Sequence, residues 1–99
     1  MTINNYGKLI KFWSKYTDSK RVLELWVKIV QETEWNNIVD VKKSYPSADA
    51  AGDCTVFNIR GNNYRLIVVI NYVFQAIDVV TVLTHAQYSK DKWKKDCDC

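Results

Sequence analysis

The stretch Val56-Phe57-Asn58-Ile59-Arg60-Gly61-Asn62-Asn63-Tyr64-Arg65-Leu66 determines how the second half of this chain folds. Strands are expected on either side of Gly61-Asn62, over residues 55–60 and 63–73. The Gly61-Asn62 pair favours a two-residue hairpin because glycine adopts a positive φ without strain. The second strand is apolar through its middle, which is typical of a central strand covered on both faces. With a third strand over residues 77–84, short loops indicate an antiparallel meander of about three strands.

Helical periodicity characterises the first half of the chain. A first helix is indicated by apolar residues at helical spacing, which are Leu9, Ile10, Trp13 and Tyr16. A second helix over residues 19–33 has one broad apolar stripe, formed by Val22, Leu25, Trp26, Ile29 and Val30. The tryptophans Trp13, Trp26 and Trp35 are interpreted as core residues.

The remaining segments complete a single α+β domain over residues 1–99. Residues 38–44 predict a short third helix before Pro46, and residues 47–53 are small and polar, as in a loop. The end of the chain predicts a short helix anchored by Trp93 and then a frayed Cys-Asp-Cys terminus. We expect the N-terminal helices to pack on one face of the sheet. The other face requires either the C-terminal segment or a partner to cover it.

Composition limits the classes of function. The chain has 99 residues, 47% of them hydrophobic, and a net charge of +3, which permits nucleic acid or an acidic protein as partner. Its longest apolar run, 66–70, is far below the roughly 20 residues of a membrane-spanning helix. The N-terminal residues lack the pattern of a secretion signal. Three cysteines, Cys54, Cys97 and Cys99, do not form a secreted disulfide framework, so we expect a cytoplasmic protein that does not contact a membrane.

Several chemistries lack their motifs. GxxxxGK[ST], GxGxxG and HExxH are absent. The chain has one histidine, and Cys97 and Cys99 lack a second ligand pair at the spacing of a zinc site. Cys54 has no basic neighbour in the sequence that would lower the pKa of its thiol. We therefore expect neither a metal nor another cofactor.

Arg65 is the first candidate for chemistry. Because strand side chains alternate, Arg65 shares a face with Ile67 and Val69, where an unpaired guanidinium is costly to bury. A guanidinium can bind two oxygens of a phosphate. The alternative is an ordinary ion pair, with Asp53 or Asp78 as the partner.

His85 and Tyr88 are the next candidates. If they open a helix, they lie on one face at i and i+3. Histidine is the usual general acid or base near neutral pH, and a tyrosine can donate a proton to a leaving oxygen. A lone histidine after a strand is more often structural.

Lysines cluster on the first helix and in the C-terminal segment. Each cluster is either a solvated face or a site of phosphate neutralisation. The lysines are Lys8, Lys11, Lys15, Lys90, Lys92, Lys94 and Lys95.

With these residues the chain resembles the HigB-type toxins of the RelE/ParE superfamily, the toxins of type II toxin–antitoxin pairs. The segments that carry the resemblance are Tyr45-Pro46-Ser47, Val56-Phe57-Asn58-Ile59, Gly61-Asn62-Asn63-Tyr64-Arg65-Leu66, Ile70-Asn71-Tyr72 and Thr84-His85-Ala86-Gln87-Tyr88. The resemblance implies a RelE-like fold and a metal-free messenger RNA endoribonuclease, often acting at the decoding site of the ribosome. In such a reaction a ribose 2′-hydroxyl attacks the adjacent phosphate and leaves a 2′,3′-cyclic phosphate.

The resemblance also implies roles for residues and partners. Arg65 resembles the phosphate-stabilising arginine of the central strand, and His85 and Tyr88 resemble the pair that transfers protons and orients RNA. Supporting RNA contacts are expected from Asn62, Asn63, Lys11, Lys90 and Lys92. The implied partner is a HigA-type helix-turn-helix antitoxin, through which alone the toxin would meet operator DNA.

One residue departs from the family pattern. Relatives commonly continue the motif with an aspartate after the tyrosine, and here Ser89 takes that place. The chain then lacks the carboxylate that the family places beside the histidine, unless Asp91 supplies it. This departure keeps a second class of function open. The chain could be a non-catalytic interaction module, either a gyrase inhibitor like ParE or a degenerate toxin that acts as a corepressor.

Overall fold

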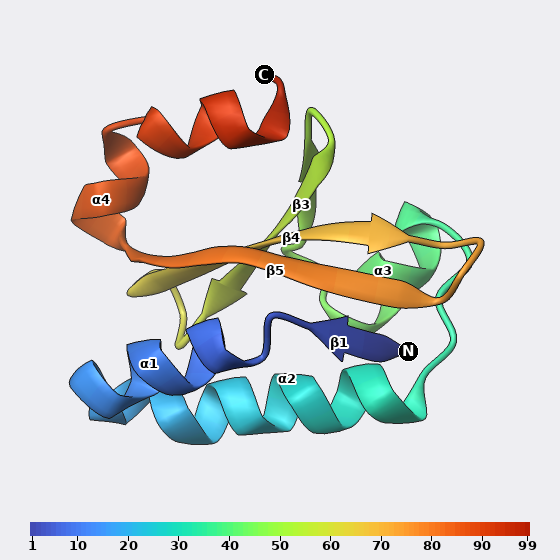
Figure 1. Ribbon diagram of the computed structural model, residues 1–99, viewed down its shortest axis with the longest axis horizontal. Helices are drawn as coiled ribbons and strands as arrows, with labels where there is room; N and C mark the ends of the chain where they lie inside the picture. Colours follow the sequence, from blue (N-terminus) through green and yellow to red (C-terminus); the bar gives the residue numbers. More distant parts are fainter.

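A five-stranded sheet forms the centre of the protein in a computed structural model that describes residues 1–99 (Figure 1). The strands lie in the order β1-β5-β4-β3-β2, and only the β1–β5 pair is parallel. Their bounds are β1 (Thr2–Asn4), β2 (Asp49–Ala51), β3 (Cys54–Ile59), β4 (Tyr64–Asn71) and β5 (Ala76–Thr84).

The α+β class and the antiparallel meander are confirmed, since β3, β4 and β5 correspond to the three predicted strands. The estimate of about three strands was too low, and the loop predicted over residues 47–53 contains β2. Both additional strands are three residues long, which is too short to show an alternating pattern in the sequence.

Two helices cover one face of the sheet (Figure 1). They are α1 (Gly7–Lys15) and α2 (Lys20–Glu32), joined by the 3-10 turn η1 (Thr17–Ser19), and α3 (Ile38–Ser44) follows. A core of 17 buried residues lies between these helices and the sheet, and it contains Trp13, Trp26 and Trp35 as predicted.

The apolar stripe assigned to α2 is partly wrong. Leu25 is 54% exposed, whereas Leu23 and Val27 are buried. Residues 23, 26, 27 and 30 have the same i, i+3, i+4, i+7 spacing as the predicted stripe, so periodicity allowed both phases of the helix. In the structure, the phase that contains Leu23 and Val27 is the one that faces the core.

The C-terminal segment covers the opposite face of the sheet, so the first of the two predicted alternatives, this segment or a partner, is confirmed (Figure 1). It consists of α4 (His85–Ser89) and the 3-10 helix η2 (Lys92–Cys97). A second core of five buried residues forms here; its members are Cys54, Val56, Ile67, Trp93 and Cys97.

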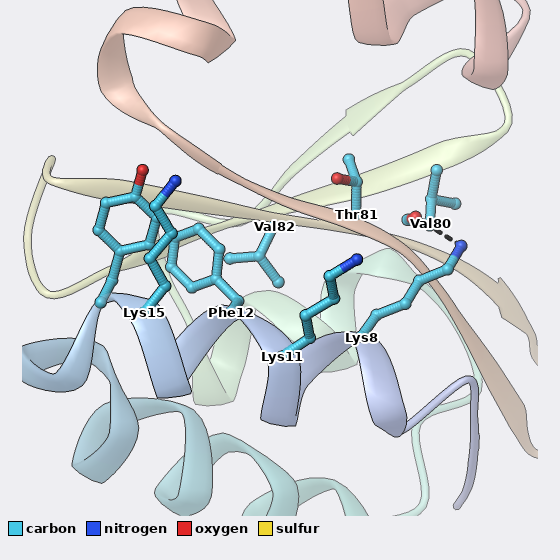
Figure 2. Close-up of a pocket in the computed structure, with 8 residues that line it drawn as sticks. Lys8, Lys11, Phe12, Lys15, Val80, Thr81 and Val82 are labelled. Atoms are coloured by element: carbon cyan, nitrogen blue, oxygen red, sulfur yellow. Dashed lines mark hydrogen bonds between the residues drawn. The ribbon is translucent and has the colours of Figure 1, made fainter.

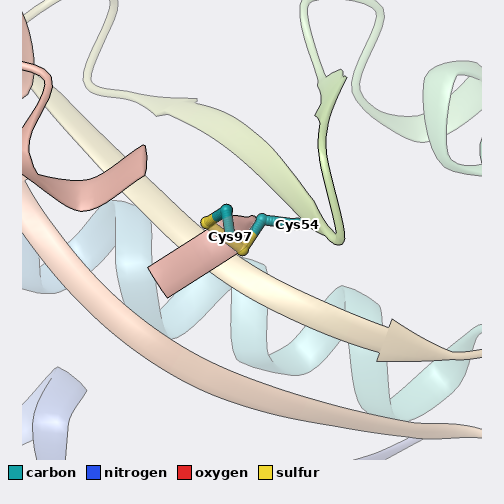
Figure 3. The surroundings of a disulfide bond; sticks show 2 residues. All are labelled: Cys54 and Cys97. Carbon is teal, nitrogen blue, oxygen red and sulfur yellow. A yellow bond between two sulfur atoms is a disulfide. The ribbon is translucent and has the colours of Figure 1, made fainter. Parts of the chain in front are cut away.

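A disulfide joins Cys54 of β3 to Cys97 of η2 (Figure 3). The prediction of a frayed Cys-Asp-Cys end is therefore wrong for Cys97, which is fully buried, although Cys99 is a free, exposed thiol. The backbone N–H of Asp53 also donates to the carbonyl oxygen of Cys97 at 2.7 Å. Hydrophobic pattern alone could not reveal this pairing because the two cysteines are 43 residues apart.

An irregularity in β5 shapes the edge of the sheet. Ile67 pairs with Thr81 but Val68 pairs with Val79, so Val80 is an extra residue on β5. Such a bulge changes which side chains face each side of a strand. β1 pairs with β5 only as far as Asp78, and the rest of that edge faces α1 (Figure 1). No helix of the protein is long and apolar enough to span a membrane.

Candidate functional site

The β3–β4 hairpin positions Arg65. The strands pair as far as Ile59 and Tyr64, so the connection has four residues, 60–63, and the predicted two-residue hairpin is wrong. Gly61 has the predicted positive φ of 64°, but Arg60 also has a positive φ, of 52°, and leaves the strand. The N–H of Asn63 donates to the carbonyl oxygen of Arg60 at 3.3 Å and closes the turn. Alternation on β4 places Tyr64 in the main core and Arg65 on the opposite face, as predicted. Arg65 pairs with Asn58 on β3 and with Leu83 on β5.

The guanidinium of Arg65 has no carboxylate partner, so the ion pair with Asp53 or Asp78 is not formed. Nη1 donates to the carbonyl oxygens of Asn62 and Tyr64 at 3.0 and 3.2 Å. Nη2 donates to Oδ1 of Asn62 at 3.3 Å. These neutral partners hold the group in place and leave its charge available for an anion.

Aromatic rings support the guanidinium from the side of the C-terminal segment. The Cζ of Arg65 lies 5.0 Å from the centre of the Tyr88 ring, within the range of a cation–π contact. Tyr88 stacks in turn on Trp93, with ring centres 5.0 Å apart and planes 10° apart. The indole N–H of Trp93 donates to the carbonyl oxygen of Tyr88 at 3.0 Å. Trp93 is thus the buried support for the Tyr88–Arg65 contact.

His85 opens α4 at the end of β5. A capping box begins this helix, because Oγ1 of Thr84 accepts from the N–H of Gln87 and the Gln87 side chain accepts from the N–H of Thr84. The backbone N–H of His85 donates to the carbonyl oxygen of Asn63 at 3.0 Å. The start of α4 is therefore tied to the same hairpin turn that holds Arg65.

Ser89 lies beside the imidazole. Its Oγ is 2.9 Å from the carbonyl oxygen of His85, to which it donates, and 3.4 Å from Nδ1 of the same residue. Asp91 does not take this role, since its carboxylate forms no hydrogen bond or ion pair with His85 and pairs with Lys94 at 3.6 Å. The side chain next to His85 is therefore a neutral hydroxyl.

The predicted site residues fall into three groups. Arg65 contacts both Asn62 and Tyr88. His85 is one helical turn before Tyr88, and the hydrogen-bond partner of its exposed side chain is Ser89. Asn63 contributes its backbone carbonyl to α4.

The lysines that were predicted to contact RNA line two grooves. The sequence did not reveal these grooves, because a groove depends on how distant elements meet. Lys90 and Lys92 line a groove of about 370 Å³ beside Trp93 and Leu83. Lys11 lines a second groove of about 420 Å³ between α1 and β5 (Figure 2).

A polar network supports the hairpin from the face of the main core. The hydroxyl of Tyr64 donates to Oδ1 of Asp18 at 2.6 Å, and Arg60 pairs with Oδ2 of the same carboxylate at 3.0 Å. The hydrogen bond to Asp18 raises the pKa of Tyr64 above its ordinary value. Tyr64 is adjacent to Arg65, so this network fixes the strand from which Arg65 projects.

Comparison with known proteins agrees with this arrangement of helices, sheet and hairpin. Residues 19–91 match the family described as HigB_toxin, the RelE-like toxic component of a toxin-antitoxin system. The chain therefore belongs to the HigB family of RelE-like toxins. It is also 27% identical to the mRNA interferase HigB of Escherichia coli O6:H1 (strain CFT073), over 77% of each chain.

Proposed function

We propose that this protein is a metal-independent messenger RNA endoribonuclease that blocks translation in the cytoplasm and acts at the ribosome. The observation that carries the proposal is the Arg65–Tyr88 contact, 5.0 Å from Cζ to the ring centre, with His85 one turn away on the same short helix. Membership of a toxin family and similarity to an mRNA interferase support it.

The proposed reaction is attack of a ribose 2′-oxygen on the adjacent phosphorus. The 2′-O–P bond forms, the P–O5′ bond breaks, and the products are a 2′,3′-cyclic phosphate and a 5′-hydroxyl. Charge accumulates on the non-bridging oxygens in the transition state, where Arg65 would stabilise it. His85 would accept the proton of the 2′-hydroxyl, and the phenol of Tyr88 would donate one to the leaving 5′-oxygen.

The hydrogen bonds of Ser89 favour His85 as the base. The single hydroxyl hydrogen of Ser89 is directed to the His85 carbonyl oxygen at 2.9 Å, so a lone pair of Oγ faces Nδ1. This arrangement suits the tautomer with its proton on Nδ1. The other ring nitrogen, Nε2, is then free to accept a proton.

The proposed partner is an antitoxin of the HigA type, which would neutralise the toxin and mediate its contact with operator DNA. Membership of a toxin–antitoxin family supports an antitoxin partner in general. The helix-turn-helix character of that partner is part of the proposal.

The test is controlled expression followed by mapping of RNA ends. Wild type is expected to arrest growth and to create new 5′-hydroxyl and 2′,3′-cyclic phosphate ends. Arg65→Ala and His85→Ala are expected to reduce cleavage by about 100-fold or more, since each removes one contribution to the transition state. Arg21→Ala, an exposed arginine on α2, is the matched control. Growth arrest by all three variants without new RNA ends would contradict the proposal.

The same experiment tests the non-catalytic alternative. That alternative is favoured by one observation, the absence of a carboxylate beside His85, where Ser89 stands. Growth arrest with intact messenger RNA and induced DNA damage would indicate a gyrase inhibitor. No arrest and no cleavage would indicate a corepressor.

A further inference from the structure

We propose that the groove between α1 and β5 binds the single-stranded RNA that flanks the cleaved phosphate. This inference rests on the proposed function and extends it to a second surface. The groove has a volume of about 420 Å³ (Figure 2). The residues that carry the argument are Lys8, Lys11, Lys15, Phe12, Tyr16 and Thr81.

The charge of the groove is entirely positive. Three exposed lysines, Lys8, Lys11 and Lys15, line it, and no acidic residue does. None of the three forms an ion pair, because the carboxylates that do form pairs bind Lys43, Arg60 and Lys94. Their spacing of three and four residues on α1 gives a row about 10 Å long, at 1.5 Å of rise per residue. A row of unpaired cations suits consecutive phosphates of a nucleic-acid strand.

Aromatic rings lie next to this row. Phe12 and Tyr16 line the groove and stack on each other, with ring centres 4.6 Å apart. Both side chains are partly exposed. Nζ of Lys15 lies 5.5 Å from the centre of the Tyr16 ring. Lysines that follow a backbone beside aromatic rings that can receive bases are the combination used to bind single strands without sequence preference.

The groove adjoins the groove beside Trp93. Thr81 of β5 lines both this groove and the one beside Trp93, so the two grooves meet at the strand. An RNA strand that lies in the groove can therefore continue across Thr81 into the groove beside Trp93, which stacks on Tyr88.

An added peptide strand fits this edge less well. Nζ of Lys8 already donates to the carbonyl oxygen of Val80 at 2.9 Å, at the bulge of β5 (Figure 2). Lysines and bulges at a sheet edge oppose pairing with another strand. The unpaired edge beyond Asp78 is thus protected, and RNA is the occupant that the lysines and rings favour.

The test measures binding of a single-stranded 2′-O-methyl RNA 12-mer, which cannot be cleaved because it has no free 2′-hydroxyl. The groove variant is Lys8→Gln/Lys11→Gln/Lys15→Gln. Its matched control is Lys20→Gln/Lys28→Gln/Lys42→Gln, which removes the same charge from exposed lysines outside the groove. We expect the groove variant alone to bind at least about tenfold more weakly. The decrease of log K for RNA binding with log salt should also become less steep, by about 2 in the magnitude of the slope. A 4-thiouridine 12-mer should crosslink to the peptide containing residues 7–16.

The outcomes separate this inference from the proposed function. A wild type that binds the 12-mer through the groove but cuts no RNA would sustain the groove as a surface for single-stranded RNA and end the ribonuclease proposal. Equal affinity in the groove and control variants, crosslinks only outside the groove, or no binding by the wild type would overturn the inference. It would also be overturned if the groove variant kept RNA affinity but lost an acidic protein partner.

Discussion

At the scale of single residues, the hydroxyl of Ser89 is the one side-chain group that hydrogen-bonds to the imidazole of His85. Ser89 Oγ contacts both the carbonyl oxygen and Nδ1 of His85, at 2.9 and 3.4 Å. We therefore propose that Ser89 positions His85, at the place where the resemblance to HigB-type toxins implies an aspartate. The tautomer of a histidine is set by the hydrogen bond that its other nitrogen makes.

The tautomer can be measured directly because His85 is the only histidine of the chain. In ¹⁵N NMR of the neutral imidazole, we expect the form protonated on Nδ1 to dominate in the wild type. Ser89→Ala should shift the population toward the form protonated on Nε2, and Ser89→Thr, which keeps a hydroxyl, should restore it. An identical tautomer ratio in wild type and Ser89→Ala would show that Ser89 has no such role.

At the scale of elements, the approach of η2 to the β2–β3 turn depends on Gly52. This residue has a φ of +57°, and a Cβ added to it would overlap the carbonyl oxygen of Cys97 and lie 2.8 Å from Cβ of Cys99. The glycine is needed here both for its backbone angle and for the close packing of the C-terminal segment.

Gly52→Ala is therefore expected to destabilise the protein, and Gly61→Ala is its matched control. Gly61 has a similar φ of +64° but open space around the position of a Cβ. Both variants incur the strain of a positive φ, and only Gly52→Ala adds the overlap with η2, at a further cost of about 1–3 kcal/mol. Urea denaturation measures the difference in the free energy of unfolding. Equal losses in the two variants would mean that η2 moves aside without cost.

Most of the elements that surround the site could be predicted from short-range sequence signals. The hairpin at Gly61 and the face of Arg65 followed from turn chemistry and strand alternation. The resemblance to HigB-type toxins implied that Arg65 and Tyr88 belong to one site. Short-range patterns do not specify their contact, because it depends on how Trp93 docks against the sheet. The disulfide and the α1–β5 groove likewise join residues that are distant in the sequence.

At the scale of the whole molecule, the sheet separates two cores of unequal size. The core under α1 and α2 contains 17 buried residues, whereas the core under η2 contains five. The smaller core carries the aromatic support of Arg65, through Trp93 and Tyr88. Its Cys54–Cys97 disulfide closes a loop with a sequence separation of 43 residues. In the chain-entropy estimate such a loop closure contributes about 4 kcal/mol to the free energy of unfolding.

Reduction is therefore expected to loosen the C-terminal segment before the rest of the protein, since small cores open locally at lower free energy than the main core. With dithiothreitol, amide hydrogen exchange in residues 92–97 should accelerate more than in β4 or α2, and the free energy of unfolding should fall by up to about 4 kcal/mol. Thiol alkylation checks the reduction, because the oxidised chain has one free cysteine, Cys99. Cys54→Ser/Cys97→Ser should exchange rapidly in this segment with or without dithiothreitol. If reduced and oxidised wild type exchange equally in residues 92–97, noncovalent packing of Trp93 alone holds the segment over the sheet.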